Sequence, residues 1–282
     1  TQAAQKLPDD YKQQIHHSLL WQALSIHDYN IPAALCVNSD QTQVVYQHSD
    51  AMTYEKTGAS QVATAGQEEK HAITVNIAIS ASGILLPLQA IYQSKSPKTL
   101  PNETCKGYAK AIGLGFRFKS SLTDTYWATL DMMKSFVTHI LVPYFLSQKI
   151  DLNLSHLHKC IWQIDVWPVH TSVDLHSWLY EKYPWIILDY VPGGCTGIFQ
   201  PCDVGIQRIF KHSVQRSQQA DIVNKVLHQL DGSAEPGSVC LDMKIGTLHK
   251  CNIATLLKAY HATNNKETVL RVGYHIIKHF VY

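Results

Sequence analysis

Residues 71–80 carry the pattern that most constrains the fold, because apolar and more polar side chains alternate there with the period of a β-strand. Four β-branched residues share one face: Ile73, Val75, Ile77 and Ile79. Ser82-Gly83 predicts a hairpin turn into a second strand over residues 84–93. With a short strand expected at 60–65, this region predicts an antiparallel meander.

Strand and helix patterns alternate through the rest of the chain. A helix is expected over residues 1–28, and Asn30-Ile31-Pro32 ends it. The later elements follow in this order: strands 33–38 and 43–47, irregular chain 99–121, helix 124–147, strand 159–164, helix 173–182, strand 186–191, and helices 203–216, 221–230, 248–262 and 268–280. Strands that alternate with helices predict parallel pairing through crossovers.

The fold class that fits this order is α/β with an RNase H-like mixed sheet, in which two parallel strands extend a three-stranded antiparallel meander. Helices flank the sheet. We expect an N-terminal helical segment at 1–30, the sheet-containing domain at 31–217 and a helical C-terminal extension at 218–282.

Composition excludes several classes of protein. The chain has 282 residues and 45% hydrophobic content, which is typical of a globular protein and not of a disordered one. The apolar runs are too short to span a bilayer, so no membrane contact is expected. Seven cysteines without CxxC spacing predict reduced thiols in place of a zinc site. A net charge of +2 means that any DNA contact must come from local basic patches.

Three aspartates stand where a divalent-metal site would need them. Asp40 and Asp165 each close an apolar, strand-like run, and Asp203 opens a helical stretch. Carboxylates that meet at a sheet edge can bind hard cations such as Mg²⁺ through oxygen. Taken singly, each aspartate is more typical of a turn, a cap or an ion pair, and Asp203 suits a helix N-cap.

Five ordered motifs resemble the pogo/Tigger/jerky-like DDE transposases. Residues 38–42 (Asn-x-Asp-Gln-Thr) resemble the first catalytic motif, and residues 53–62 (Thr-Tyr-x3-Gly-Ala-x-Gln-Val) the stretch after it. Residues 83–93 (Gly-x2-Leu-Pro-x-Gln-x2-Tyr-Gln) resemble the next motif. Residues 164–172 (Ile-Asp-Val-Trp-x-Val-His-x-Ser) are similar to the second catalytic block in a fungal form, and residues 191–205 (Val-Pro-x2-Cys-Thr-x3-Gln-Pro-x-Asp-Val-Gly) to the third.

The resemblance implies a transposase catalytic domain that cleaves and joins DNA phosphodiesters. Asp40, Asp165 and Asp203 would be the catalytic triad and would hold two Mg²⁺ or Mn²⁺ ions. The implied partner is double-stranded DNA, bound by a homodimer in the nucleus. The chain departs from the family at Tyr54, Ser94 and Tyr126, which flanks the family-like Trp127.

Other residues are weaker candidates for the same site. Gln41, Thr42, His170 and Gln200 would support the triad or contact substrate, although a turn or loop role explains the first three about equally well. Six basic residues are candidate phosphate contacts, because a positive side chain can pair with the DNA backbone: Lys95, Lys98, Arg208 and Lys211, and also Lys106 and Arg216. A solvated polar face would account for these basic residues as well.

Two other functions stay open on the sequence alone. The chain could be a domesticated, non-catalytic nuclear DNA-binding or scaffold protein that keeps the transposase fold. It could also be a metal-dependent phosphohydrolase of small substrates, which the low charge favours and the ordered motifs disfavour. No glycine-rich phosphate loop, nucleophile elbow or dinucleotide fingerprint is present, which excludes kinases, serine hydrolases and dehydrogenases.

Overall fold

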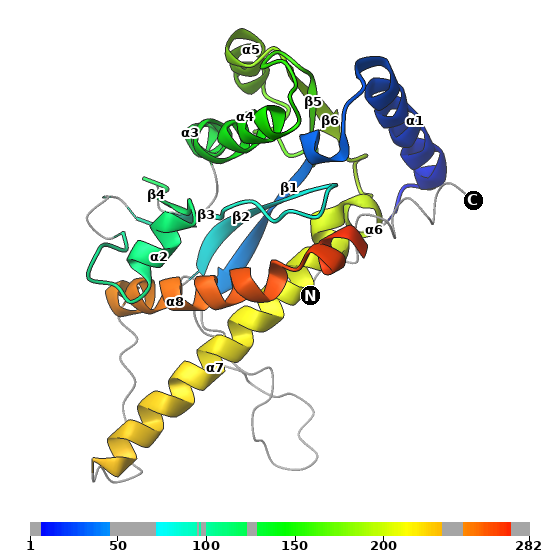
Figure 1. Cartoon of the computed structure of the whole chain (residues 1–282). Helices are drawn as coiled ribbons and strands as arrows, with labels where there is room; N and C mark the ends of the chain where they lie inside the picture. The colour runs from blue at the N-terminus through cyan, green and yellow to red at the C-terminus, as the bar shows by residue number, and fades with distance from the viewer. Residues whose placement is uncertain are drawn as a thin grey trace, which may run out of the picture.

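The computed structural model describes residues 7–45, 72–94, 96, 100–122, 129–232 and 245–271. Its centre is one mixed sheet in the order β4-β3-β2-β1-β5-β6 (Figure 1). The strands are β1 (Cys36–Val45), β2 (Ala72–Ser80), β3 (Gln89–Tyr92), β4 (Arg117–Ser120), β5 (Cys160–Ile164) and β6 (Ile186–Tyr190). β1, β2 and β3 pair antiparallel, whereas β5 joins β1 and β6 joins β5 in parallel. This confirms the predicted mixed sheet.

The first strand differs from the expectation. Residues 33–38 and 43–47 were expected as two short strands, but β1 is one strand that runs through the polar stretch between them. Its partner β2 is buried along its whole length and pairs with β1 from Val37 to Val45. Pairing with a buried neighbour keeps the polar stretch extended, because no glycine or proline interrupts it. Asp40 therefore lies in mid-strand and not at a strand end.

The hairpin after β2 is confirmed, but the third strand is shorter than expected. Gly83 takes a φ of +91°, which a turn glycine adopts without strain. Only Gln89–Tyr92 of residues 84–93 form a regular strand, since Leu85 makes an isolated bridge to Ile79 and Pro87 has no N–H to pair. The stretch expected to be irregular contains α2 (Tyr108–Gly113) and the edge strand β4, which pairs parallel to β3.

Helices cover both faces of the sheet (Figure 1). On one face lie α3 (Leu130–Phe136), a π-helical turn η3 (Val137–Leu141), α4 (Val142–Asp151) and α5 (Val173–Lys182). On the other lie α6 (Thr196–Phe199), a π-helical turn η4 (Cys202–Ile206), α7 (Gln207–Asp231) and α8 (Ile245–Thr263). α1 (Tyr11–Tyr29) packs near β6 through Ile15, which contacts the cluster around Val191 and Phe199, and it ends at Asn30 with a φ of 50°. The short helix η1 (Ala33–Leu35) leads into β1.

The expected helices 203–216 and 221–230 are one continuous helix, α7. Residues 217–220 contain no helix breaker, and Ser217 is buried against Thr255 of α8 with their hydroxyl oxygens 3.3 Å apart. Packing against α8 therefore carries the helix through a polar stretch. The expected helix 268–280 is helical over its described residues, up to 271, and the remainder lies outside the described part. The expected strand 60–65 lies outside it as well.

Among the residues that the structure describes, no helix is long and apolar enough to cross a membrane.

Candidate metal centre

Two of the three candidate carboxylates come together through strand pairing. β1 and β5 are parallel neighbours, with Asn38 opposite Gln163. Two residues further along each strand direction stand Asp40 and Asp165. Since side chains two residues apart on a strand share a face, both carboxylates lie on the face that α6 and α7 cover. Parallel pairing thus joins residues from distant parts of the sequence.

The third carboxylate reaches the same place through a π-helical turn. Asp203 lies in η4, and its carboxyl group is hydrogen-bonded to that of Asp40. Burial, followed by the nearby charge of Asp203, raises the pKa of Asp40 well above its usual range. Burial also raises the pKa of Asp203, and the charge of Asp165 adds to this. The pair therefore holds a proton more readily than two free carboxyl groups would.

Gln207 is a contact that the sequence interpretation did not anticipate. It is the first residue of α7, it is buried, and its Nε2 donates a hydrogen bond to Oδ2 of Asp40. It stands four residues after Asp203, which places the two side chains on the same side of the helix. The spacing of four residues from Asp203 was the only sequence signal for Gln207. It indicates a contact with Asp40 only once η4 is known to pack against β1.

The carboxylate of Asp165 is held by His170. The Nδ1 of His170 lies 2.6 Å from Oδ1 of Asp165, and because a carboxylate only accepts, Nδ1 carries the proton. His170 is buried and packs edge-on against Trp167, with ring centroids 5.5 Å apart. The hydroxyl of Tyr190 donates to the backbone oxygen of His170 at 2.7 Å. These contacts place His170 beside the carboxylates.

The other candidate residues are distributed unevenly. Gln41 points to the opposite face of the sheet, where its Nε2 lies 3.1 Å from the sulfur of Met133, so it is not brought to the carboxylates. Thr42 follows Asp40 on the same face, and its buried hydroxyl has no hydrogen-bond partner within the described residues. Gln200 is fully buried and donates to the backbone oxygen of Ser39 at 3.4 Å.

The basic candidates divide between α7, the exposed Lys106 just before α2, and the part that is not described. Arg208 and Lys211 are exposed on α7, and the charge of Lys211 lowers the pKa of Asp203 against the effect of burial. Lys95 and Lys98 lie outside the described residues. Arg208 and Lys211 therefore place positive charge about one and about two helical turns beyond Asp203.

The three carboxyl groups suit a hard divalent cation, although they are not arranged around a common point. Within the described residues, no group of three or more His, Cys, Asp or Glu side chains is arranged to hold a metal ion. Asp40 and Asp203 contact each other, while Asp165 is turned to His170. Carboxylate oxygens are the ligands that Mg²⁺ and Mn²⁺ prefer, and a cation would neutralise the repulsion that raises the pKa of Asp40. Asp40, Asp165 and Asp203 are thus the residues that could hold such ions.

Asp189 is a further carboxyl group on the same face, and unlike the three half-buried aspartates it is buried. It accepts hydrogen bonds from Nε2 of Gln22 at 2.6 Å and from Nε2 of Gln163 at 3.0 Å. Burial raises the pKa of Asp189 to about 6, and these two hydrogen bonds oppose the rise. The folded state therefore holds the proton more tightly than the unfolded chain, in which an aspartate titrates near pH 3.9.

This shift predicts a pH-dependent stability. The contribution of Asp189 is fully present below about pH 3.9 and is lost as the pH rises through about 6, at a cost of roughly 2–3 kcal/mol. In Asp189→Asn this part of the pH dependence should vanish, because the amide does not titrate and can still accept a hydrogen bond. Urea unfolding of both proteins between pH 4 and 7.5 measures the difference. Parallel stability curves over that range would contradict the assignment.

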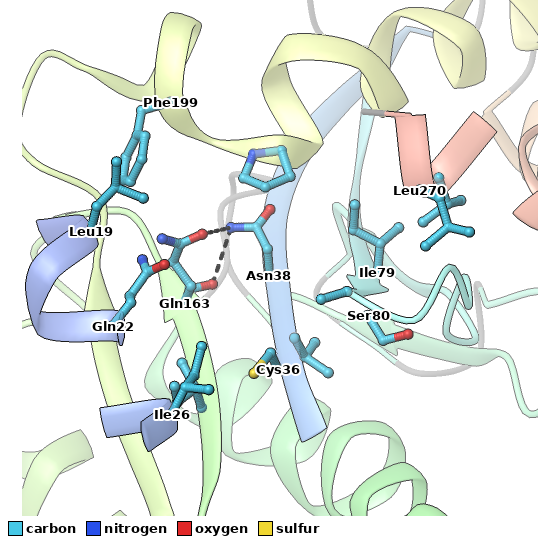
Figure 2. A pocket seen from close by; sticks show the side chains of 15 residues that line it. Leu19, Gln22, Ile26, Cys36, Asn38, Ile79, Ser80, Gln163, Phe199 and Leu270 are labelled. Atoms are coloured by element: carbon cyan, nitrogen blue, oxygen red, sulfur yellow. Dashed lines mark hydrogen bonds between the residues drawn. The ribbon is translucent and has the colours of Figure 1, made fainter. Parts of the chain in front are cut away.

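A cavity of about 180 Å³ lies beside Gln22 and Gln163, the two hydrogen-bond partners of Asp189. It is situated between α1, the sheet and the C-terminal helical residues (Figure 2). Leu19, Gln22 and Ile26 of α1 form one wall, and Leu270 lies on the opposite side. Asn38 and Gln163 form the polar part of its lining. The cavity is mostly apolar, so it does not extend the cluster of carboxylates.

Comparison with known proteins bears on the family and the fold. The model of the DDE superfamily endonuclease family matches residues 70–267, and no curated protein matches. The fold is similar to the Mos1 transposase paired-end complex with left transposon end (TM-score 0.52, 9% identity). It is also similar to the Mos1 mariner paired end complexes with Mn (0.50, 12%) and with Mg (0.50, 10%).

Each of these three comparisons covers 98% of this chain but only 62% of the solved one, so the chain spans less than two thirds of their length. At such low identity the likeness establishes the fold alone. The family match, in contrast, extends over more than half of the chain and includes Asp165 and Asp203. The chain therefore belongs to the DDE superfamily endonuclease family.

Proposed function

We propose that this chain is the catalytic domain of a transposase, or of a protein derived from one, and that it cleaves and joins DNA phosphodiesters in the nucleus. The observation that carries the proposal is the convergence of Asp40, Asp165 and Asp203 from two strands and a helix start on one face of the sheet. Membership of the endonuclease family supports it. The similar solved structures are named as transposase complexes, two of them with Mn or Mg.

The three aspartates would hold two divalent metal ions. Such ions, when bound, supply an activated attacking oxygen and neutralise charge that develops on the phosphodiester. The protein's own residues prepare the ligands. Gln207 fixes one oxygen of Asp40, and His170 keeps Asp165 oriented. The proton shared by Asp40 and Asp203 would leave when the cation arrives, so metal binding should tighten as the pH rises.

Double-stranded DNA is the proposed partner, and α7 offers its described contacts. Arg208 and Lys211 are exposed on the first turns of α7, next to Asp203. Cations at this place can contact the phosphates that flank the scissile bond and hold it near the carboxylates. Lys95 and Lys98 remain predicted contacts. A homodimer in the DNA complex also remains a prediction.

The test is nicking of supercoiled plasmid by the full chain in Mn²⁺ and in Mg²⁺, beside Asp165→Asn and the control Asp174→Asn. We expect metal-dependent nicking that falls by about 10²-fold in Asp165→Asn, because an anionic ligand is lost while its neighbours remain. Asp174 is an exposed residue in the first turn of α5, so its variant should cleave like the wild type.

Each alternative outcome has a clear meaning. Equal nicking by all three proteins would indicate a contaminating nuclease or another site. A folded wild-type protein that binds DNA without cutting it would favour the non-catalytic DNA-binding function over the enzyme.

A further inference from the structure

The carboxamide of Asn38 contacts every segment that carries one of the three aspartates. Its Oδ1 accepts a hydrogen bond from the backbone N–H of Cys202 at 3.0 Å. Its Nδ2 lies 3.2 Å from Oε1 and 3.3 Å from the backbone oxygen of Gln163, to which it donates (Figure 2). Asn38 itself stands two residues before Asp40. One buried side chain therefore joins β1, β5 and the start of η4.

Each residue that Asn38 contacts stands only one or two residues before an aspartate in the sequence. Gln163 precedes Asp165 by two residues, and Cys202 precedes Asp203 by one. A shift at any of the three attachment points would therefore move the carboxylate beside it. The N–H of Cys202 also belongs to the beginning of a helix, where donors lack a partner within the helix, so Asn38 acts there like a cap.

Gln200 makes a second connection between the same segments. Its Nε2 donates to the backbone oxygen of Ser39, which directly precedes Asp40. Asn38 thus reaches from β1 to the chain before Asp203, and Gln200 reaches back from that chain to β1. The side chains of Asn38 and Gln200 are 6% and 0% exposed, and burial of polar amides at this depth costs free energy that only well-placed partners recover.

We propose that Asn38 is a positioning residue that sets the spacing of Asp40, Asp165 and Asp203 for metal binding, with Gln200 as its counterpart. The inference rests on the proposed function, since it assigns these aspartates to a metal site. Removal of the Asn38 amide leaves the Cys202 N–H and the Oε1 of Gln163 without their Asn38 partner. The three segments then lose their common attachment, and the ligands lose their fixed separation.

The experiment measures Mn²⁺ affinity of the full chain by calorimetry for Asn38→Ala, Gln200→Ala and Asn76→Ala. Asn76 is the control, because it is also a buried asparagine, in β2, and lies on the opposite face of the sheet. We expect the Mn²⁺ dissociation constant to rise by about 10- to 100-fold in Asn38→Ala and by about tenfold in Gln200→Ala. Asn76→Ala should leave the affinity within about twofold, because Asn76 faces away from the three carboxyl groups.

Urea unfolding of each variant separates positioning from a general loss of stability, because a purely structural role would make affinity follow stability in all three. If Asn38→Ala does not fold, Gln200→Ala decides the question. Wild-type affinity in a folded Asn38→Ala would overturn the positioning role alone. A wild-type protein without Mn²⁺ affinity would overturn the proposed function, and the positioning role with it.

Discussion

Replacement of Asp40 by asparagine should make the metal-free protein more stable and reduce DNA cleavage by roughly 10⁴-fold. Asp40 is more deeply buried than Asp203 and is hydrogen-bonded to both Asp203 and Gln207. Burial and the adjacent charges make its ionised form costly, which is the cause of its raised pKa. An amide has nearly the same shape, accepts from Gln207 and donates to Asp203, so the cost disappears while the contacts stay.

We expect a gain of about 1 kcal/mol in the free energy of unfolding without metal. The wild-type protein should gain stability when Mn²⁺ is added, because a ligand that binds only the folded state shifts the equilibrium. Asp40→Asn should show almost no such gain. Thermal unfolding with and without Mn²⁺, together with plasmid nicking, measures all three effects. A variant that is less stable than the wild type in EDTA would contradict the argument that Asp40 is held at an electrostatic cost.

Trp162→Ala should lower the free energy of unfolding by about 4 kcal/mol. Trp162 lies on β5 and is fully buried beneath α3, where its ring centroid is 6.2 Å from that of Phe136. Its Nε1 donates to the hydroxyl of Ser39 on β1 at 2.8 Å. The variant therefore opens a large cavity and also leaves a buried hydroxyl without its donor.

Two companion variants separate these contributions, with stability taken from urea unfolding curves. Trp162→Phe keeps most of the packing and should cost roughly 1.5 kcal/mol, which reports mainly on the hydrogen bond. Trp21→Ala is the matched control, because Trp21 is 58% exposed on α1 and its loss should change stability by less than about 0.5 kcal/mol. Similar losses in Trp162→Ala and Trp21→Ala would refute the assignment of Trp162 to the core.

Sequence periodicity predicted the sheet well where one local preference, such as burial or turn geometry, decides the conformation. The alternation around Ile77 reflects a strand whose side chains are all buried, and the turn at Gly83 needs a backbone conformation that glycine favours. Asp165 directly follows β5, as its apolar run predicted. Local composition was misleading where tertiary contacts decide, as at Ser217, which packing on α8 keeps helical, and in β4, which has a weak pattern of its own but pairs with β3.

The candidate site shows the same difference between residues that local motifs predict and residues that only tertiary contacts bring together. Asp40, Asp165 and Asp203 were predicted from motifs, and their convergence follows from the parallel pairing of β1 with β5 and the packing of η4 on β1. Gln207 and the contacts of Asn38 could not be predicted, because each joins segments far apart in the sequence through a single side chain. Gln41 was expected near the site but faces α3, since neighbours on a strand point to opposite faces.

The separation of these contacts along the chain also has a consequence for protein synthesis. Asn38 meets Gln163 across 125 residues and Cys202 across 164. At typical rates of translation, the ribosome needs roughly ten to thirty seconds to make the chain between Asn38 and Cys202. During that interval the nascent polypeptide has Asp40 but neither Asp203 nor Gln207, the two side chains that are hydrogen-bonded to it. The cluster of Asp40 with Asp203 and Gln207 can therefore form only late in synthesis, after most of the sheet has been made.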